Sequence, residues 1–410
     1  MFQDDKELFH IYINKGLYSN KFGLNELKIL IVFFLKDIIK SMIYFLTPIK
    51  KVELNFLRSK NVLFIGSKNN YQTLKFLKNK LPHTLFVSPG GYGATISNCF
   101  NIRPFINNFT EFKKYFFIFY LMFSSNYIIS NIEKILKSYG LINIYISILK
   151  NNRPNSIVIS NDHDPSSRGI IIAAKKLKIP CIYIQHASVS KYFPPLRFSH
   201  ALLYGQYSKD VYEKIGETNT KVYQVGMHQF DYLKQIIENK YLTQRIGLAF
   251  NTIDDIDDVS DLYKELNNVF PNVEIIIRPH PRDKRKLSDN FNISSLNKED
   301  ATAFLSKVDI LIAGNSSILL EAALMNVLPL QYYFGKHSEK FGDYYGFIKT
   351  GLAIEVYSPA DVIEKIDNFY STHELNIRQK AKVYDASVNS DFEFKVEEKI
   401  VEIIINDILA

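Results

Sequence analysis

Short apolar runs that alternate with helical stretches limit the fold of this chain more than any other feature. After residue 154 the sequence reads SIVISND, then a helical stretch over 166–178, then IPCIYIQHA. Strands that alternate with helices predict a parallel, doubly wound sheet, in which crossovers are almost always right-handed. In this first series the expected strands are 84–88, 156–162, 179–187, 200–205 and 221–226, with another opening at Asn61 and helices at 166–178 and 208–215.

A second alternating series begins near Gln244 and predicts a second sheet of the same kind. The length of the chain agrees with this prediction, because 410 residues suit two domains of roughly 150–200 residues each. The expected strands here are 245–251, 273–281, 308–314 and 327–334, with helices at 260–270, 298–307 and 316–326.

The fold class predicted from these two series is α/β, with two Rossmann-like doubly wound parallel-sheet domains facing a cleft and an N-terminal helical segment. The expected parts are an N-terminal helical segment over 1–60, an N-terminal Rossmann-like domain over 61–235, a C-terminal Rossmann-like domain over 243–370, and C-terminal helices over 371–410 that pack across the cleft.

The segment Leu27–Ile49 bears on membrane association. It is apolar and long enough to span a bilayer, but Lys36, Asp37 and Lys40 lie in its middle, where each charge costs a few kcal/mol. A helix lying in the membrane interface is one interpretation, and a core helix of the first domain is the other. We therefore expect a cytoplasmic protein that is peripheral on the inner face of the cell membrane if the first interpretation holds.

Cysteine content and charge exclude other classes. The only cysteines, Cys99 and Cys181, form no CxxC pair, so a structural zinc site is excluded and a reducing cytosol is the natural compartment. The formal charge of +8 is spread along the chain, without an Arg-rich arm or zinc-finger spacing. We expect no nucleic acid partner.

The first candidate site is GNSS at 314–317, where a predicted strand ends and a helix begins. Asn315, Ser316 and Ser317 stand where free backbone N–H groups and hydroxyls suit a nucleotide phosphate. Glu321, one turn further on, is a candidate for a ribose hydroxyl. A plain helix N-cap and a solvated glutamate are the competing interpretations.

The second candidate site is RPHP at 278–281, at the carboxyl end of the predicted strand 273–281. The two prolines, of which Pro281 is the second, fix the backbone around His280. Arg278 and His280 could both contact a phosphate of the donor. A surface histidine in a turn is the alternative.

The third candidate site is NDHD at 161–164, at the end of a strand in the first series. A carboxylate near an imidazole can act as general base toward a sugar hydroxyl, and we assign that role to Asp162, beside His163 as an acceptor contact. Asp164 is expected to cap the following helix, and it remains the second candidate for the base.

The fourth candidate site is QHASVSKYFPPLRF at 185–198, one βα unit later. His186 should therefore lie beside Asp162 at the same sheet edge, and it is a further catalytic candidate. The polar and basic groups expected to bind the acceptor here are Gln185, Ser188, Lys191 and Arg197.

No residue cluster predicts a metal site or a cofactor. The run DDIDD at 254–258 resembles a metal cluster, but its position between a strand and a helix favours an exposed acidic loop. The expected ligands are a nucleotide-sugar donor and an oligo- or polysaccharide acceptor, with a lipid-linked form left open.

Taken together, the two Rossmann-like domains, the HP pair and the SS pair resemble the GT-B glycosyltransferases that use CMP-activated acidic sugars, the bacterial sialyltransferases and Kdo transferases. The stretch IQHASVSKYFPPLRF with the upstream ND resembles the capsule and surface polysaccharide biosynthesis group, and the resemblance covers roughly residues 155–355. It implies a metal-independent transferase in which His280, Ser316 and Ser317 contact the donor phosphate. It also implies an acidic base, for which Asp162 or Asp164 is the nearest match, although NDHD lacks the glycine of the sialyltransferase motif.

Three other functions stay open. The chain also resembles UDP-sugar 2-epimerases, but the HVEAG loop of those enzymes would fall at 184–188, where this sequence reads IQHAS without the glutamate. A transferase using CDP-glycerol or a UDP-sugar and a non-catalytic GT-B scaffold are the remaining alternatives.

Overall fold

The computed structural model describes residues 32, 39, 57–89, 95–96, 99–101, 141–162, 164–191, 193–238, 240–285, 287, 290–295, 299–372 and 376–410. Most of the predicted segment 1–60, including nearly all of Leu27–Ile49, lies outside these residues, as does His163. Within the described ranges, no helix combines the length and apolarity needed to cross a membrane.

The chain forms two compact domains, each described here by itself. The N-terminal domain comprises the chain up to Leu203 together with Ser208–Gln224 and Glu397–Ala410. The C-terminal domain comprises Tyr204–Tyr207 and Val225–Val396. The chain thus passes between the domains more than once, and its last residues belong to the N-terminal domain.

The N-terminal domain contains a seven-stranded sheet in the order β3-β2-β1-β4-β5-β6-β7, with every neighbouring pair parallel. Its inner strands are short runs such as NVLF, SIVI and CIYI that are buried along their whole length, as expected when helices cover both faces. The strands are β1 Asn61–Phe64, β2 Thr84–Ser88, β3 Cys99–Asn101, β4 Ser156–Ile159, β5 Cys181–Ile184, β6 His200–Leu203 and β7 Lys221–Gln224.

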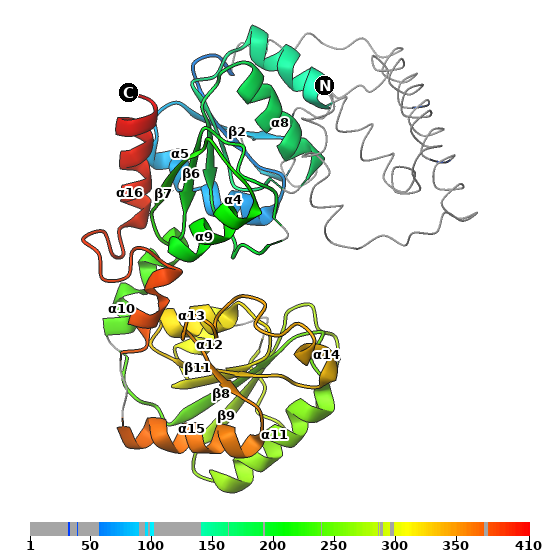
Figure 1. Cartoon of the computed structure of the whole chain (residues 1–410), viewed down its shortest axis with the longest axis vertical. Helices are drawn as coiled ribbons and strands as arrows, with labels where there is room; N and C mark the ends of the chain where they lie inside the picture. The colour runs from blue at the N-terminus through cyan, green and yellow to red at the C-terminus, as the bar shows by residue number, and fades with distance from the viewer. Residues whose placement is uncertain are drawn as a thin grey trace. The chain divides into compact units, whose positions relative to one another are not determined.

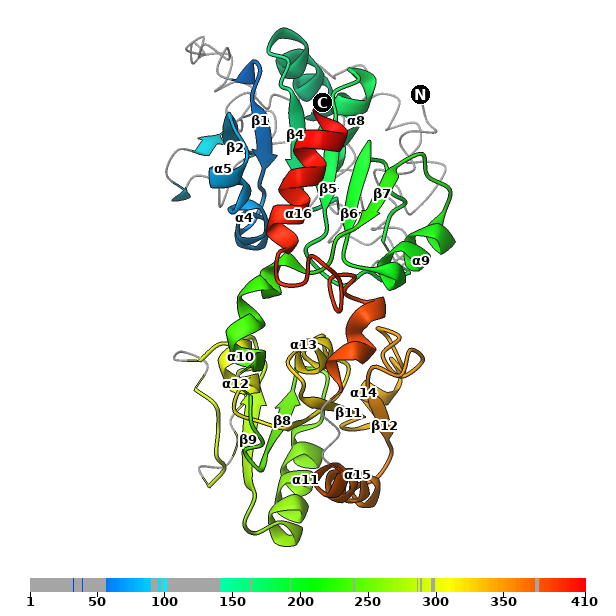
Figure 2. The same cartoon turned by 90° about the vertical axis from the view of Figure 1, so that its left-hand side faces the viewer.

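Helices cover both faces of this sheet (Figures 1 and 2). Helix α8 packs on one face through Ala173 and Ala174, which are fully buried and whose small side chains allow a close approach to the sheet. Helices α5 and α16 lie side by side on the other face, where Lys80 forms ion pairs with Glu397 and Glu398. The helices are α4 Lys68–Leu74, α5 Leu77–Lys80, α8 Pro165–Lys176, α9 Gln206–Ile215, α16 Val396–Ile403 and η7 Ile404–Ile408.

The C-terminal domain contains a five-stranded parallel sheet in the order β12-β11-β10-β8-β9. Read along the chain this is the 2-1-3-4-5 order of doubly wound sheets, in which the strand order reverses between the first and third strands. The strands are β8 Arg245–Phe250, β9 Glu274–Pro279, β10 Ile310–Ala313, β11 Leu328–Tyr332 and β12 Ile354–Val356.

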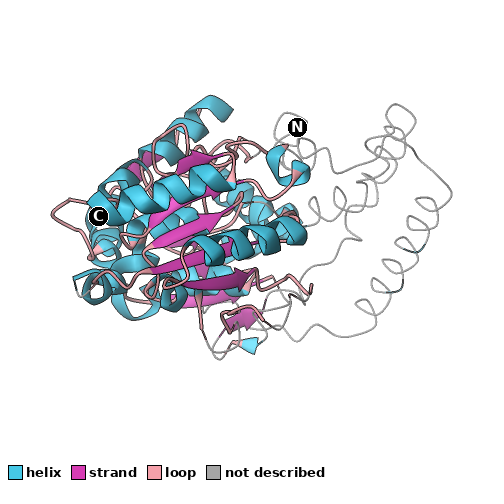
Figure 3. Cartoon of the chain, turned by 90° about the horizontal axis from the view of Figure 1, so that it is seen from below, coloured by secondary structure: helices cyan, strands magenta, loops and turns pink. Residues whose placement is uncertain are grey.

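Helices α11 and α15 cover one face of this sheet, and α12 and α13 cover the other (Figures 1 and 2). Figure 3 shows strands lying between layers of helices. The helices are η5 His228–Leu233, α10 Lys234–Glu238, α11 Ile256–Val269, α12 Ala301–Leu305, α13 Ile318–Leu324, α14 Lys336–Glu339, α15 Pro359–Thr372 and η6 Arg378–Val383.

The prediction of an exposed acidic loop at 254–258 holds only in part, because Asp255, Asp257 and Asp258 are exposed but the run is not all loop. Helix α11 begins within this run, where the Asp255 carboxylate accepts a hydrogen bond from the Asp257 N–H at 2.9 Å and caps the helix. Asp254 is buried, with 2% of its surface exposed. The acidic residues therefore serve a helix N-terminus, where their charge complements the free N–H groups.

Candidate functional site

The point where the strand order reverses in the C-terminal sheet brings two predicted strand ends together. Strands β8 and β10 pair with Ala249 opposite Ala313, so that Asn251 and the segment 314–317 leave the sheet side by side. The Asn251 side chain donates to the Asn315 carbonyl at 3.3 Å. In doubly wound sheets ligands bind outside the carboxyl ends of the strands at this position.

Gly314 fits this position because it has no side chain. A Cβ atom on Gly314 would lie 2.6 Å from the Asp254 Oδ1 atom and 3.2 Å from the Ser338 Oγ atom. The buried Asp254 carboxylate accepts hydrogen bonds from the Asn251 N–H at 2.8 Å and the Ser338 hydroxyl at 2.7 Å. Burial raises the pKa of Asp254, and these hydrogen bonds oppose the rise. Asp254 thus ties together the segments that follow β8 and β11 next to Gly314.

The polar side chains of GNSS differ in how far the protein engages them. The Asn315 side-chain amide donates to the Ser338 carbonyl at 3.1 Å, so this side chain is engaged within the protein. The Ser316 hydroxyl makes one long contact, accepting from the Ile318 N–H at 3.5 Å. Ser317 is exposed, and within the described ranges no hydrogen bond uses its hydroxyl. Both hydroxyls therefore remain able to bind a ligand at the start of α13.

His280 follows β9, the neighbour of β8 in the sheet. Its backbone N–H donates to the Phe250 carbonyl at 2.9 Å, which fixes the loop, and its side chain is exposed. The Nδ1 atom accepts a hydrogen bond from the Arg282 N–H at 3.1 Å. That bond assigns the proton of the neutral ring to Nε2, which can then donate to a ligand. Pro281 is exposed in the same turn.

Arg285 joins the segments that follow β8 and β9. Its guanidinium group makes a two-atom contact with the Asp283 carboxylate and also donates to the carbonyls of Asp254 at 2.7 Å and Asn251 at 2.9 Å. Planar pairing of this kind restricts geometry as well as adding charge. The loop that carries His280 is thereby held against the loop that carries Asn251.

Arg278 lies in the interior of the C-terminal domain. It is buried, and its guanidinium donates to the Ser294 hydroxyl at 2.8 Å and the Glu299 carbonyl at 3.3 Å. The side chain of Glu321 is half-buried, and its charge interacts with that of Arg278. Burial raises the pKa of Glu321 to about 7, with Arg278 opposing the rise and Asp300 adding to it.

In the N-terminal domain the strand order reverses between β1 and β4, and NDHD follows β4 at that position. Asp162 is fully buried, and its Oδ2 atom lies 3.8 Å from the Arg168 guanidinium, which is also buried. Asp164 accepts hydrogen bonds from the N–H groups of Ser166 and Ser167 at 2.9 and 3.0 Å. The prediction that Asp164 caps α8 is therefore confirmed.

Strand β5 pairs with β4, with Tyr183 opposite Ile159, so the segments that carry His186 and Asp162 leave neighbouring strands at one edge, as predicted. His186 is half-buried. Gln185 is buried and donates to the Ala187 carbonyl at 2.9 Å and the Ser208 hydroxyl at 3.0 Å, which makes it part of the loop's own support.

The remaining acceptor candidates fall into two positions. Ser188 is half-buried and Lys191 is exposed, and both lie in the loop that follows β5. Arg197 lies at the far end of that loop, just before β6, and donates to the Glu217 carbonyl at 2.9 Å. Because residues before a parallel strand lie at the amino edge of the sheet, Arg197 is separated from the edge that carries His186.

The sequence patterns missed four residues of the C-terminal site: Asn251, Asp254, Arg285 and Ser338. Asn251 ends a predicted strand, so strand-end position alone would have found it. The other three act through a strand order that local patterns do not specify. Within the described ranges, no group of three or more His, Cys, Asp or Glu side chains is placed to hold a metal ion.

Comparison with known proteins shows the fold. No protein-family description matches the sequence, and no curated protein matches it either. Solved structures do match, among them UDP-GlcNAc 2-epimerase from Neisseria meningitidis bound to UDP-GlcNAc, with 14% identity, a TM-score of 0.55, and coverage of 84% of this chain and 99% of that one.

Two transferase structures match to a similar degree. A variant of the wall teichoic acid polymerase TagF gives 13% identity and a TM-score of 0.53, covering 94% of this chain and 98% of that one. The glycotransferase of kitacinnamycin gives 10% identity and a TM-score of 0.50, covering 85% of this chain and 99% of that one. The predicted pair of Rossmann-like parallel-sheet domains of the GT-B class is therefore confirmed, while the closer resemblance to sialyltransferases and Kdo transferases stays a prediction.

Proposed function

We propose that the chain is a glycosyltransferase that moves a sugar from a nucleotide-activated donor to a surface polysaccharide acceptor. The observation that carries this proposal is the C-terminal switch point, where Asn251 and GNSS leave adjacent strands and His280 follows the next one. The side chain of His280 and the hydroxyls of Ser316 and Ser317 offer donors for a phosphate at this edge.

The donor site would act mainly on the leaving group. As the bond between the sugar and the nucleotide breaks, negative charge grows on the phosphate oxygen. The Nε2–H of His280 and the hydroxyls of Ser316 and Ser317 would stabilise that charge. Arg278 would act from the interior by holding the end of β9, and Glu321 would accept from a ribose hydroxyl. No step in this scheme requires a divalent metal.

The acceptor would bind at the carboxyl edge of the N-terminal sheet. There a base removes the proton of the attacking hydroxyl as the new glycosidic bond forms. Asp162 and His186 are the two proposed bases. His186 is half-buried whereas Asp162 is fully buried beside Arg168, which supports His186 as the group that a substrate can reach. His163, Ser188 and Lys191 are proposed acceptor contacts.

The cellular setting follows from the sequence resemblance. The proposed pathway is capsule or O-antigen assembly in the cytoplasm, with CMP-activated sialic acid or Kdo as the donor implied by the resemblance. Peripheral attachment to the inner face of the membrane through Leu27–Ile49 belongs to the same proposal. Cell fractionation tests it, because full recovery without salt or detergent in the soluble fraction would count against attachment.

Two neighbours favour other donors. The epimerase structure contains UDP-GlcNAc, which supports a UDP-sugar 2-epimerase as the second candidate. A TagF variant soaked with CDPG covers 94% of this chain and supports a CDP-glycerol-type transferase. A GT-B scaffold without catalysis is the remaining alternative, and it predicts no turnover with any donor.

Calorimetry with CMP-N-acetylneuraminic acid, CDP-glycerol and UDP-GlcNAc separates these candidates. The expected result is that one of them binds, and that the double variant Ser316→Ala/Ser317→Ala weakens it roughly ten- to hundredfold, the usual effect of losing hydrogen bonds to a charged group. Ser371→Ala is the matched control, since it removes a hydroxyl that only donates to the Asn368 carbonyl.

His280→Asn refines this test. Asparagine can keep the acceptor for the Arg282 N–H while losing the outward Nε2–H, so weaker donor binding would assign the effect to that proton. Binding that is unchanged in all of these variants would exclude the switch point as the donor site. Activity that is lost in EDTA and restored by magnesium would exclude metal independence.

A further inference from the structure

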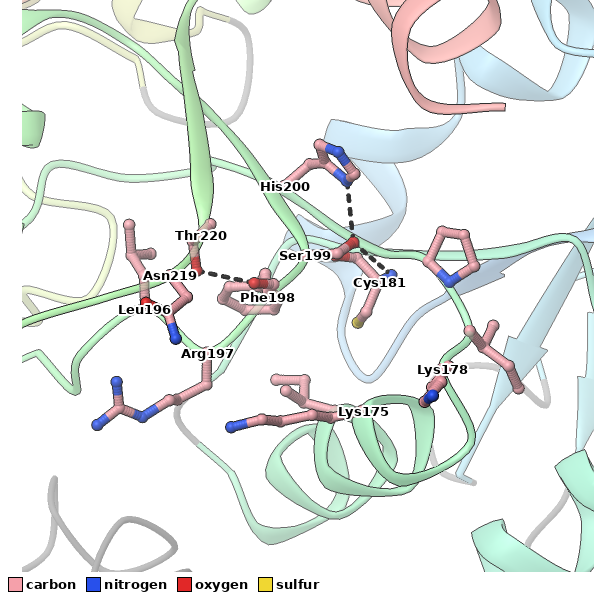
Figure 4. Close-up of a pocket in the computed structure, with 13 residues that line it drawn as sticks. Lys175, Lys178, Cys181, Leu196, Arg197, Phe198, Ser199, His200, Asn219 and Thr220 are labelled. Carbon is pink, nitrogen blue, oxygen red and sulfur yellow. Dashed lines mark hydrogen bonds between the residues drawn. The ribbon is translucent and has the colours of Figure 1, made fainter. Parts of the chain in front are cut away.

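A cavity lies on the N-terminal domain, at the sheet edge opposite the proposed acceptor site. It has a volume of about 350 Å³ and is lined by α8 and by the segments that lead into three strands: 178–181 into β5, 196–200 into β6, and 219–220 into β7 (Figure 4). Residues that precede parallel strands gather at the amino edge, whereas Asp162 and His186 follow their strands. The cavity is therefore distinct from the site of proposed chemistry.

The rim of this cavity is positively charged. Lys175, Lys178 and Arg197 contribute three cations, and in Figure 4 they lie along one side of the drawn residues. No aspartate or glutamate is among the described residues that line it. Burial and Lys221 lower the pKa of His200 at the opposite side, while the Asp407 carboxylate opposes this change, and the imidazole adds a hydrogen-bonding group.

The cationic residues are anchored by the backbone around them. Lys178 ends the α8 connection in a left-handed conformation with φ of 52°. Arg153 donates to the carbonyls of Leu177 and Lys178 at 2.6 and 2.7 Å, which holds this turn. Arg197 is fixed at one end by its bond to the Glu217 carbonyl. The backbone turn that carries Lys178 and the guanidinium group of Arg197 are thus held in place.

The interior of the cavity is apolar. Side chains of Ile171, Ile179, Leu196 and Phe198 line it, together with Cys181, and all five are buried. Ser199 closes the polar side, where its hydroxyl bridges to the Cys181 backbone and contacts His200 at 2.9 Å. Apolar residues beside a row of three cations suit a molecule that has an anionic end and a hydrocarbon body.

We propose that this cavity binds an amphipathic phosphate, meaning a phosphomonoester or diphosphate that carries an apolar group. Three cations without a carboxylate favour a group with close to two negative charges, such as phosphate at neutral pH, over a single carboxylate. The apolar residues favour an attached hydrocarbon over inorganic phosphate. This binding does not depend on the proposed transferase activity. It would give the N-terminal domain a second ligand site, at the sheet edge opposite Asp162 and His186.

Calorimetry on the full chain tests the proposal with geranyl diphosphate, pyrophosphate and decanoate as probes. Geranyl diphosphate should bind at least about tenfold more tightly than pyrophosphate, because burial of several methylene groups adds to the charge interaction. It should also bind more tightly than decanoate, which carries one negative charge. Tighter binding of decanoate would overturn the phosphate assignment, and equal binding of pyrophosphate would overturn the role of the apolar interior.

Variants locate the binding. Lys175→Gln/Lys178→Gln should weaken geranyl diphosphate about three- to thirtyfold, as expected when two partly exposed ion pairs are lost. Lys176→Gln is the matched control, since Lys176 is an exposed lysine of the same helix that does not line the cavity. An equal loss in the control, or no loss in the double variant, would exclude this site.

A sedimentation experiment with lipid vesicles distinguishes a lipid headgroup from a free phosphate compound as the ligand. Sedimentation with vesicles that contain phosphatidic acid, a phosphomonoester lipid, would assign the phosphate to a lipid headgroup if the double variant abolishes it, and binding of geranyl diphosphate alone would assign it to a free compound. Nucleotide binding at GNSS should be unchanged in the double variant. Failure of the cavity proposal is therefore distinguishable from failure of the transferase proposal.

Discussion

Replacing Glu321 by glutamine tests the electrostatics of the proposed donor site. Burial raises the pKa of Glu321 from 4.5 to about 7, so the folded domain binds a proton more tightly than the unfolded chain. The stability from this proton is fully present below pH 4.5 and is lost as the pH rises through about 7. At 1.36 kcal/mol for each pH unit, the loss amounts to at most about 3 kcal/mol.

Glutamine imitates the protonated side chain, so Glu321→Gln should remove this part of the pH dependence. At pH 8 the variant should be more stable than the wild type. Hydrogen exchange at the amides of β10 should then be up to about a hundredfold slower in the variant than in the wild type. Burial raises the pKa of Asp254 and of Asp385 as well, and both add a slope of the same sign. The difference between the two pH profiles therefore isolates Glu321.

Glu339→Gln on α14 is the control, because Glu339 is exposed. Exchange should be measured from pH 4.5 to pH 8 and corrected for the pH dependence of intrinsic exchange. Parallel profiles for wild type and Glu321→Gln would show that Glu321 is already ionised in the folded domain at low pH. That result would refute the argument that burial keeps this carboxyl protonated.

Three further substitutions test local roles. Asp164→Ala should destabilise the N-terminal domain by about 1–2 kcal/mol, the usual cost of losing a helix cap, and an unchanged urea midpoint would contradict the capping geometry. Asp162→Asn should cost about 3 kcal/mol because it leaves the buried Arg168 without its carboxylate, whereas a normal midpoint with lost turnover would favour Asp162 as the base. Gly314→Ala should cost about 1–3 kcal/mol by displacing Asp254 and should weaken nucleotide binding in calorimetry, and wild-type values for both would contradict the close contact.

Most strands could be predicted from the sequence because buried parallel strands are continuous apolar runs. Thr84–Ser88 matches the expected strand residue for residue, and four of the five strands of the C-terminal sheet were predicted, all except the edge strand β12. Strands β3 and β12 were missed because each has three residues and lies at a sheet edge, where no long apolar run is required. The order of strands within each sheet was not predictable from local patterns.

For the candidate sites, too, the sequence predicted position along the chain but not the three-dimensional arrangement. Alternation identifies which residues follow a strand, so GNSS, His280, Asp162 and His186 were placed at strand ends. It does not identify which way a side chain points once the strand has ended. Nor does it identify which face of the sheet a strand residue points to, and Arg278, which still lies within β9, proved to be buried against Ser294.

The remaining site residues were not predicted because they meet only through tertiary contacts. The support of the C-terminal site depends on Asp254 and Ser338, which are 84 residues apart and meet through a hydrogen bond. The cationic cavity was missed because its residues come from α8 and from three segments at the amino edge of the sheet, which the strand-end rule leaves out.

Hydrogen exchange with and without a bound nucleotide tests the central claim most directly. The probe is whichever of CMP-N-acetylneuraminic acid, CDP-glycerol and UDP-GlcNAc binds in calorimetry. We predict slower exchange in the segment 314–321 at the start of α13 and in the loop around His280, with no change in the segments 178–181 and 196–200. Protection confined to the N-terminal domain, with exchange at GNSS unchanged, would contradict the assignment of the C-terminal switch point as the donor site.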